Sequence, residues 1–181
     1  AKMGATVSKG LSLVEHDAQR GLDADYALIC YGGNDSDYDW AAIAADPEGD
    51  HQPHTKRETF RQTLDSILKV LYRQGVQPVL MSLPPIDPRR YLRFICRNGL
   101  DRNAIMRWLG DEDMIYRHQE LYSDTVTELA YANGVPLIHV RQAFLADHHM
   151  NDLLSADGIH LTMDGYGKLF DTLADWLRPK L

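Results

Sequence analysis

The sequence is poor in cysteine and in basic residues, and it has no long apolar run. Two cysteines among 181 residues cannot build a disulfide framework, and Cys30 lies in an apolar run where a small buried side chain is expected. The 19 Lys and Arg residues against 26 Asp and Glu residues give a formal net charge of −7, which disfavours a nucleic-acid-binding protein. No apolar stretch reaches the roughly 20 residues needed to span a bilayer. The low cysteine content favours a reducing, cytoplasmic setting.

The N-terminal end shows no secretion signal, because no charged segment followed by an apolar one occurs there. The sequence begins with Ala1 rather than Met, so we expect the natural N-terminus to lie upstream of it. Hydrophobic residues make up 44% of the chain and charged residues 25%, which is typical of a globular protein. We therefore predict a single domain over residues 1–181 that is incomplete at its N-terminal end.

Short apolar runs alternate with helical patterns along the chain. Strands are expected over residues 26–31, 76–83 and 135–140, and apolar stripes at helical spacing occur within residues 11–18, 60–71, 115–133 and 166–177. The run at residues 26–31 is nearly continuous, which is typical of a strand buried on both faces. Such alternation predicts an α/β fold with a parallel sheet and helices on both faces. Reactive side chains are then expected in the loops that follow the strands.

The turn directly after the first predicted strand has the sequence Gly-Gly-Asn-Asp at residues 32–35. Two glycines permit a sharp turn with close backbone approach, and the amide of Asn34 follows them. An amide N–H stabilises a negatively charged oxygen without itself titrating, so Asn34 is a candidate oxyanion donor. The alternative is a turn in which the Asn34 side chain only bonds its own loop.

A second pattern, Asp-Gly-Ile-His at residues 157–160, precedes the last predicted helix, for which Thr162 is the expected N-cap. A carboxylate three residues before an imidazole can accept a hydrogen bond from Nδ1–H, which leaves Nε2 as a base. The alternative is a loop aspartate beside a solvated histidine. Near the start of the chain, the backbone N–H of Gly4 is a candidate second oxyanion donor, because no side chain blocks approach to it.

In this order, the three segments resemble sequence blocks of the SGNH hydrolase family, the GDSL-type esterases and lipases. Residues 32–35 are similar to the family's Gly-x-Asn-Asp block, and residues 157–160 to its Asp-x-x-His block. The segment that begins Gly-Ala-Thr at residue 4 is similar to the block that supplies a backbone oxyanion donor. The resemblance runs from Gly4 to about Leu177, which is almost the whole chain.

The resemblance implies a three-layer α/β/α, flavodoxin-like fold and the hydrolysis of carboxylic esters by an esterase, lipase, lysophospholipase or acetylesterase. It implies that His160 acts as the base and that Asp157 orients it, while Gly4 N–H and the Asn34 side chain bind the oxyanion. The expected substrate is a small-molecule ester, and this chemistry needs no metal and no organic cofactor.

The family's nucleophile block, Gly-Asp-Ser, does not occur in these residues. Ser36 lies in an acidic run, Ser155 is too close to Asp157, and Ser8 falls in a predicted helix, so none is a good substitute. We expect the nucleophile and the first strands of the sheet to come from an upstream segment or a partner chain. Without them the sheet would expose an apolar edge. The alternative is a catalytically inactive binding or interaction module on the same scaffold.

Four residues are candidates for contacts with the substrate because they fall in or near the predicted loops: Gly33, Trp40, Asp87 and Arg89. The arginine-rich stretch at residues 89–107 either contacts an anionic group or forms a helical cap paired with local acids, and the second is favoured. Its aromatic and apolar residues form either a lid or a small core. A long polar loop is expected at residues 41–56, and the Asp, His-pair and His-His patterns nearby are more typical of solvated loops than of metal sites.

Overall fold

The computed structural model describes residues 4–180, which form two compact units. The first comprises the described residues up to Asp37 together with Gln52–Leu83 and Leu121–Ile138. The second comprises Tyr38–His51, Pro84–Glu120 and the described residues from His139 onward. Among the described residues, no helix combines the length and the apolar character that a membrane crossing requires.

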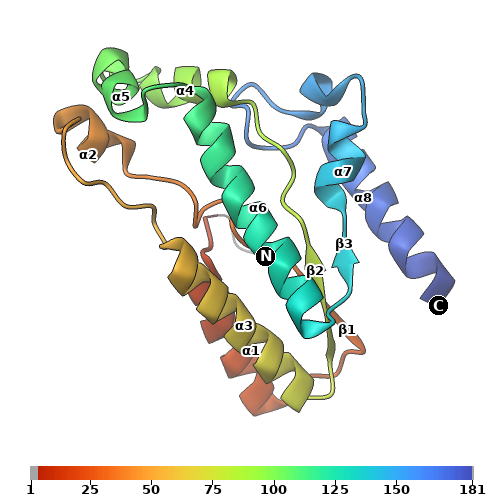
Figure 1. The fold of residues 1–181 in the computed structure, drawn as a ribbon. Coiled ribbons are helices and arrows are strands. Elements are labelled where there is room, and N and C mark those ends of the chain that lie inside the picture. Colours follow the sequence, from red (N-terminus) through yellow and green to blue (C-terminus); the bar gives the residue numbers. More distant parts are fainter. Residues whose placement is uncertain (1–3, 181) are drawn as a thin grey trace. The chain divides into compact units, whose positions relative to one another are not determined.

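The first unit contains a parallel three-stranded sheet and the helices that cover its core. Its elements are α1 (Val7–Arg20), β1 (Tyr26–Ile29), α3 (Arg57–Arg73), β2 (Gln77–Met81), the second half of α6 (Asp113–Asn133) and β3 (Leu137–Ile138). The strand order is β1-β2-β3, and both pairs are parallel (Figure 1). The predicted α/β fold with a parallel sheet is confirmed, and so are the four predicted helices, although each strand is shorter than expected.

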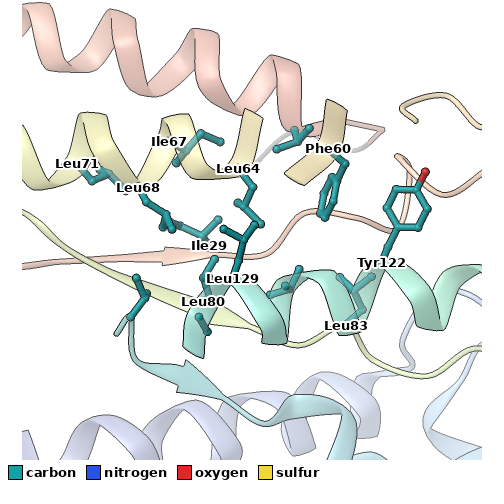
Figure 2. Packing of buried hydrophobic residues seen from close by; sticks show 14 of the residues in the cluster. Ile29, Phe60, Leu64, Ile67, Leu68, Leu71, Leu80, Leu83, Tyr122 and Leu129 are labelled. Atoms are coloured by element: carbon teal, nitrogen blue, oxygen red, sulfur yellow. The ribbon is translucent and has the colours of Figure 1, made fainter. Parts of the chain in front are cut away.

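The core of the first unit is made by the apolar stripe of α3, which the spacing predicted. Phe60, Leu64, Ile67, Leu68 and Leu71 are all buried (Figure 2). They pack with residues of β1, β2 and α6, while α1 lies beside α3 (Figure 1). The period of this stripe places all five side chains on one face of the helix, so the rest of its surface is left to polar residues.

Strand β1 differs from its prediction as a strand buried on both faces. Ile29 is buried, but Tyr26 is 40% exposed and Leu28 is 50% exposed, and Cys30, just after the strand, is exposed as well. The reason is the strand order: among the described residues β1 pairs only with β2, so it forms an edge of the sheet. The central strand β2 shows the expected pattern, with residues 78–81 all buried.

The second unit is mostly helical. Its elements are α2 (Trp40–Ala45), α4 (Pro88–Cys96), α5 (Arg102–Leu109), the first half of α6, α7 (Val140–Leu145), the 3₁₀ helix η1 (Met150–Leu153), α8 (Met163–Leu177) and the 3₁₀ helix η2 (Arg178–Lys180). The predicted N-cap of α8 is confirmed, because the Thr162 hydroxyl accepts a hydrogen bond from Gly165 N at 3.1 Å.

Two expectations for the second unit are corrected or decided by the structure. The long polar loop expected from residue 41 begins instead as α2, because Asp39 caps that helix through Ala42 N and Ile43 packs into a core. The arginine-rich stretch forms α4 and α5, and the aromatic and apolar residues of these helices build a core of their own around Tyr91, Leu92 and Ile105. The stretch is therefore helical with a small packed core, and its contact with an anionic group stays a prediction.

Truncating a side chain of the α3 stripe tests this account of the first core. Leu64→Ala should lower the free energy of unfolding by about 2–5 kcal/mol, because it leaves a cavity beneath a buried helix face. Chemical denaturation followed by circular dichroism measures the loss. Leu13→Ala is the matched control, since Leu13 is 40% exposed on α1 and its loss should cost about 0.5 kcal/mol or less. Equal effects of the two substitutions would contradict the assigned core.

Candidate active site

The Gly-Gly-Asn-Asp turn follows β1 and depends on close packing of its first glycine. Gly32 has φ +132°, and a Cβ at this position would lie 2.8 Å from Leu83 Cδ1. An L side chain would therefore be strained and would also collide with the core. The turn is closed by Ser36 N, which donates to Gly32 O at 2.9 Å. Glycine at this position lets the chain leave the sheet sharply and present Asn34 on the surface.

Asp35, the last residue of this turn, is fully buried and holds the N-terminal end of α1. Its two carboxylate oxygens lie 3.0 and 3.1 Å from Val7 N. Thr6 occupies the N-cap position of α1 but makes no side-chain capping bond, so a carboxylate 28 residues away takes that role. Burial raises the pKa of Asp35, and hydrogen bonds from Thr55 and from Val7 N partly offset this rise.

This contact brings together the two segments that sequence analysis assigned to the oxyanion site. The side-chain amide of Asn34 donates to Ala5 O at 3.4 Å, so Asn34 lies beside the residue that follows Gly4. An amide NH2 group carries two hydrogens, and this long bond uses one of them. Both Gly4 and Asn34 are exposed. The alternative in which Asn34 bonds only its own loop does not describe this turn.

Two residues that sequence analysis did not assign to this turn also hold it. His54 Nδ1 lies 3.0 Å from Asn34 O, and Thr55 N donates to Asp35 O at 3.0 Å. No spacing rule links His54 to Asn34, which lies 20 residues earlier in the sequence. The described residues contain no group of three His, Cys, Asp or Glu side chains arranged to hold a metal ion.

In the second unit, Asp157 and His160 form a hydrogen-bonded pair. His160 Nδ1 lies 2.7 Å from Asp157 Oδ2, with the imidazole side chain 58% exposed and the carboxylate 15% exposed. The backbone N–H groups of Ile159 and His160 both donate to Asp157 Oδ1 at 3.0 Å. The predicted contact between carboxylate and imidazole is present.

The electrostatics of Asp157 favour its ionised form. Burial alone would raise its pKa, but hydrogen bonds from His160 N, the Ser155 hydroxyl, the His160 ring and Ile159 N together hold the pKa well below its usual range. Asp157 is therefore a carboxylate throughout the neutral range. An ionised carboxylate at Nδ1 fixes the tautomer of His160 and leaves Nε2 to accept a proton.

The turn that carries this pair is docked on the start of α4. Asp87 N donates to Gly158 O at 2.8 Å. Gly158 has φ +80°, and a Cβ there would lie 2.6 Å from Asp87 O, so only glycine fits this contact. The glycine between Asp157 and Ile159 thus lets the turn pack directly on the α4 backbone.

The four candidate substrate residues are placed differently. Gly33 is exposed in the turn after β1. Trp40 is only 7% exposed in the second core. The Asp87 carboxylate caps α4 and accepts hydrogen bonds from Arg89 N and Arg90 N, both at 3.0 Å. Arg89 pairs with Glu112 at 3.0 Å and is 69% exposed. Their contacts with a substrate stay predictions.

The serines near the site are engaged within the fold. Ser36 is 6% exposed and donates to Gly33 O at 3.0 Å. Ser155 donates to Asp157 Oδ1 at 2.6 Å. These bonds agree with the sequence argument that neither is the nucleophile.

The first unit has a Gly-x-Asn-Asp turn after a strand of a parallel sheet, and the second has a hydrogen-bonded Asp–His pair, as the resemblance to SGNH hydrolases implied. The model of the GDSL-like lipase/acylhydrolase family matches residues 1–168. The chain belongs to this family. No curated protein matches it.

Solved structures share this fold at low sequence identity. A lipase/acylhydrolase from Enterococcus faecalis has a TM-score of 0.65 and 18% identity, with 98% of this chain and 73% of that chain covered. A GDSL-like lipase from Bacteroides thetaiotaomicron has a TM-score of 0.64, 18% identity and the same coverage. A catalytic mutant of an acetylxylan esterase from Geobacillus stearothermophilus has a TM-score of 0.63 and 20% identity, with 95% and 67% covered.

Removing the Asp35 carboxylate should free the start of α1. In Asp35→Ala, Val7 N loses its acceptor, and we expect its amide hydrogen exchange to accelerate by about tenfold, the size of a lost helix cap. Exchange read by NMR at single residues measures this. Asp17→Ala, on the exposed surface of the same helix, should leave the Val7 amide unchanged. Unchanged exchange in Asp35→Ala would contradict the capping role.

The lowered pKa of Asp157 predicts a pH-dependent stability contribution. The folded-state pKa lies below the unfolded value near 4, so the contribution is complete above that pH and is lost as the pH falls toward the folded value. Asp157→Asn should therefore cost about 1–3 kcal/mol at pH 7 and progressively less below about pH 4. Urea denaturation at several pH values measures the difference. Asp152→Asn, at a 78% exposed side chain, is the control and should cost about 0.5 kcal/mol or less at pH 7.

Proposed function

We propose that the protein is a serine ester hydrolase that works by two-step acyl transfer. The observation that carries the proposal is the 2.7 Å hydrogen bond between Asp157 and His160, within a turn that leaves the imidazole more than half exposed. This pair supplies an oriented base with a compensating negative charge behind it. Family membership supports ester hydrolysis as the reaction, and the solved relatives named above include a lipase and an acetylxylan esterase.

In the first step a serine hydroxyl attacks the ester carbonyl carbon while His160 Nε2 accepts the hydroxyl proton. The resulting tetrahedral intermediate collapses, the bond to the alcohol oxygen breaks, and His160 returns the proton to that alcohol. Water then attacks the acyl-serine in the same way and releases the acid. Asp157 stays ionised throughout and stabilises the imidazolium that forms in each half-reaction.

The negative oxygen of each intermediate is the proposed ligand of Gly4 N–H and the Asn34 side-chain amide. The support is their adjacency in the first unit, where Asn34 bonds Ala5 O and Asp35 fixes the start of α1. Held in this way, the donors do not need to reorganise as charge develops, which is the condition for effective oxyanion stabilisation.

The nucleophilic serine is proposed to lie outside these residues, on an upstream segment or a partner chain that adds a strand to the sheet. Strand β1 supports this proposal, because it is an edge among the described residues and exposes Tyr26 and Leu28. Apolar side chains on a free edge favour pairing with a further strand. In α8, Met163 is 85% exposed and Phe170 is 69% exposed. Contact with a further segment would bury this apolar surface.

Activity-based labelling of the full natural polypeptide that contains residues 1–181 tests the proposal. A fluorophosphonate probe should label one serine upstream of residue 1 or on a partner chain, and p-nitrophenyl acetate should be hydrolysed. His160→Ala should abolish both, and Asn34→Ala should lower kcat by about 10²–10³-fold through loss of one oxyanion donor. His16→Ala is the matched control, because His16 is 61% exposed and also contacts a neighbouring aspartate.

Absence of labelling and of hydrolysis would overturn the proposal and would favour the inactive binding module. Labelling that is unchanged in His160→Ala would equally overturn the assigned base. A probe attached to Ser36 or Ser155 would contradict the placement of the nucleophile while leaving the class of reaction intact.

A further inference from the structure

Ser155 lies two residues before Asp157, and its hydroxyl makes a short hydrogen bond at the back of the Asp157–His160 pair. The hydroxyl donates to Asp157 Oδ1 at 2.6 Å. Because Asp157 is ionised, it accepts in this bond and Ser155 donates. Its closeness to Asp157 in the sequence makes Ser155 a poor nucleophile, so the hydroxyl is left with a different role.

The bonds to Asp157 are divided unequally between its two oxygens. Oδ1 receives three donors, namely Ser155 Oγ, Ile159 N and His160 N. Oδ2 receives His160 Nδ1. Three donors on one oxygen fix the rotation of the carboxylate about the Cβ–Cγ bond. This rotation determines where Oδ2 lies relative to the imidazole. Of these three, the Ser155 hydroxyl is the only one supplied by a side chain.

The backbone of Ser155 is anchored separately from its side chain. Ser155 N donates to His160 O at 2.8 Å, and Ser155 O accepts from Gly158 N at 3.0 Å. Leu154 and Leu161 close the base of the turn as an antiparallel bridge. Loss of the hydroxyl therefore leaves the bonds that shape the turn in place.

Two charged residues packed against this turn, Asp87 and Arg90, form an ion pair with each other. The Asp87 carboxylate lies 3.2 Å from Arg90 Nε, and Arg90 Nη1 also donates to Leu154 O at 3.1 Å. Asp87 contacts the turn through its backbone N–H, which donates to Gly158 O. Asp87 and Arg90 thus bond each other and backbone atoms of the turn. The neutral side chain that bonds the Asp157 carboxylate is Ser155.

We propose that Ser155 is a positioning residue for catalysis, and that its hydroxyl fixes the Asp157 carboxylate so that Oδ2 holds His160 in the orientation and tautomer of a base. The proposal rests on the function proposed above. Ser155 touches neither the substrate nor the reacting atoms in this role. It also draws charge toward Oδ1, which moderates how tightly the pair holds a proton on the imidazole.

The test compares Ser155→Ala with Ser155→Thr in the full natural polypeptide. Ser155→Ala should lower kcat for p-nitrophenyl acetate by about tenfold, the loss expected for one hydrogen bond to a charged group, and change KM less than twofold. It should also move the acid limb of the kcat/KM profile to higher pH, because a carboxylate with fewer donors retains the imidazolium proton more strongly. Ser155→Thr keeps the hydroxyl and should restore both kcat and the profile. Ser66→Ala, at a partly exposed serine of α3 whose hydroxyl donates to Gln62 O, is the matched control.

A second readout does not depend on catalysis. In ¹⁵N-labelled protein, the His160 ring resonances report the Nδ1–H bond to Asp157 directly, and Ser155→Ala should move the Nδ1–H proton signal and raise the pH midpoint of the ring titration. Ser155→Thr should restore both signals.

The outcomes separate this inference from the proposed function. If the protein hydrolyses the ester, His160→Ala is inactive and Ser155→Ala matches the parent in kcat, pH profile and ring signals, the inference about Ser155 is wrong and the hydrolase stands. If no esterase activity is found yet Ser155→Ala alters the ring signals and Ser155→Thr restores them, the positioning contact stands and the proposed function fails. A Ser155→Ala protein whose Tm falls sharply and which Ser155→Thr does not restore would show a structural role and overturn the inference.

Discussion

Hydrogen bonds from backbone N–H groups to a carboxylate are the interaction on which both candidate segments depend. Both carboxylate oxygens of Asp35 accept a hydrogen bond from Val7 N. One oxygen of Asp157 accepts hydrogen bonds from Ile159 N and His160 N. In each case a short stretch of chain that lacks regular hydrogen bonds is held by a side chain. Charge-assisted bonds of this kind are stronger than neutral ones, which suits turns that must keep a defined shape while exposed.

The pKa values of the two carboxylates are shifted in opposite directions. Burial dominates at Asp35 and raises its pKa, whereas the donors dominate at Asp157 and lower its pKa. The difference follows from the environment. Asp35 is fully buried under the start of α1, while Asp157 sits in a turn that provides four donors. Under the proposed function, the carboxylate that must remain charged is the less deeply buried of the two.

The motif Gly-Gly-Asn-Asp carries two separate tasks in adjacent residues. Asn34 is exposed and is the proposed oxyanion donor, while Asp35 is buried and secures the segment that contains Gly4. The pairing explains why a loop near residue 5 and a turn near residue 34 behave as one structural element in the first unit. It also explains why Thr6 can occupy the N-cap position of α1 without a capping bond of its own.

Much of this was determined by the sequence itself. Apolar periodicity placed the long helices α3, α6 and α8, because an amphipathic helix repeats its buried face every three to four residues. The local spacing of Asp157 and His160 also determined their contact, since three residues in a tight turn cannot separate the two side chains far. The short helices α2 and α7 lack enough turns to show a period, and they were not predicted.

Tertiary structure decided the rest, because it depends on which distant residues meet. The edge position of β1, which exposes Leu28 and Cys30, follows from strand order and not from the apolar run itself. The cap that Asp35 supplies to Val7 joins residues 28 positions apart, and the contact of His54 with Asn34 O joins residues 20 positions apart. Periodicity and local spacing carry no information about such pairs, since the pairs form only when the chain has folded and buried charges and backbone groups must find partners.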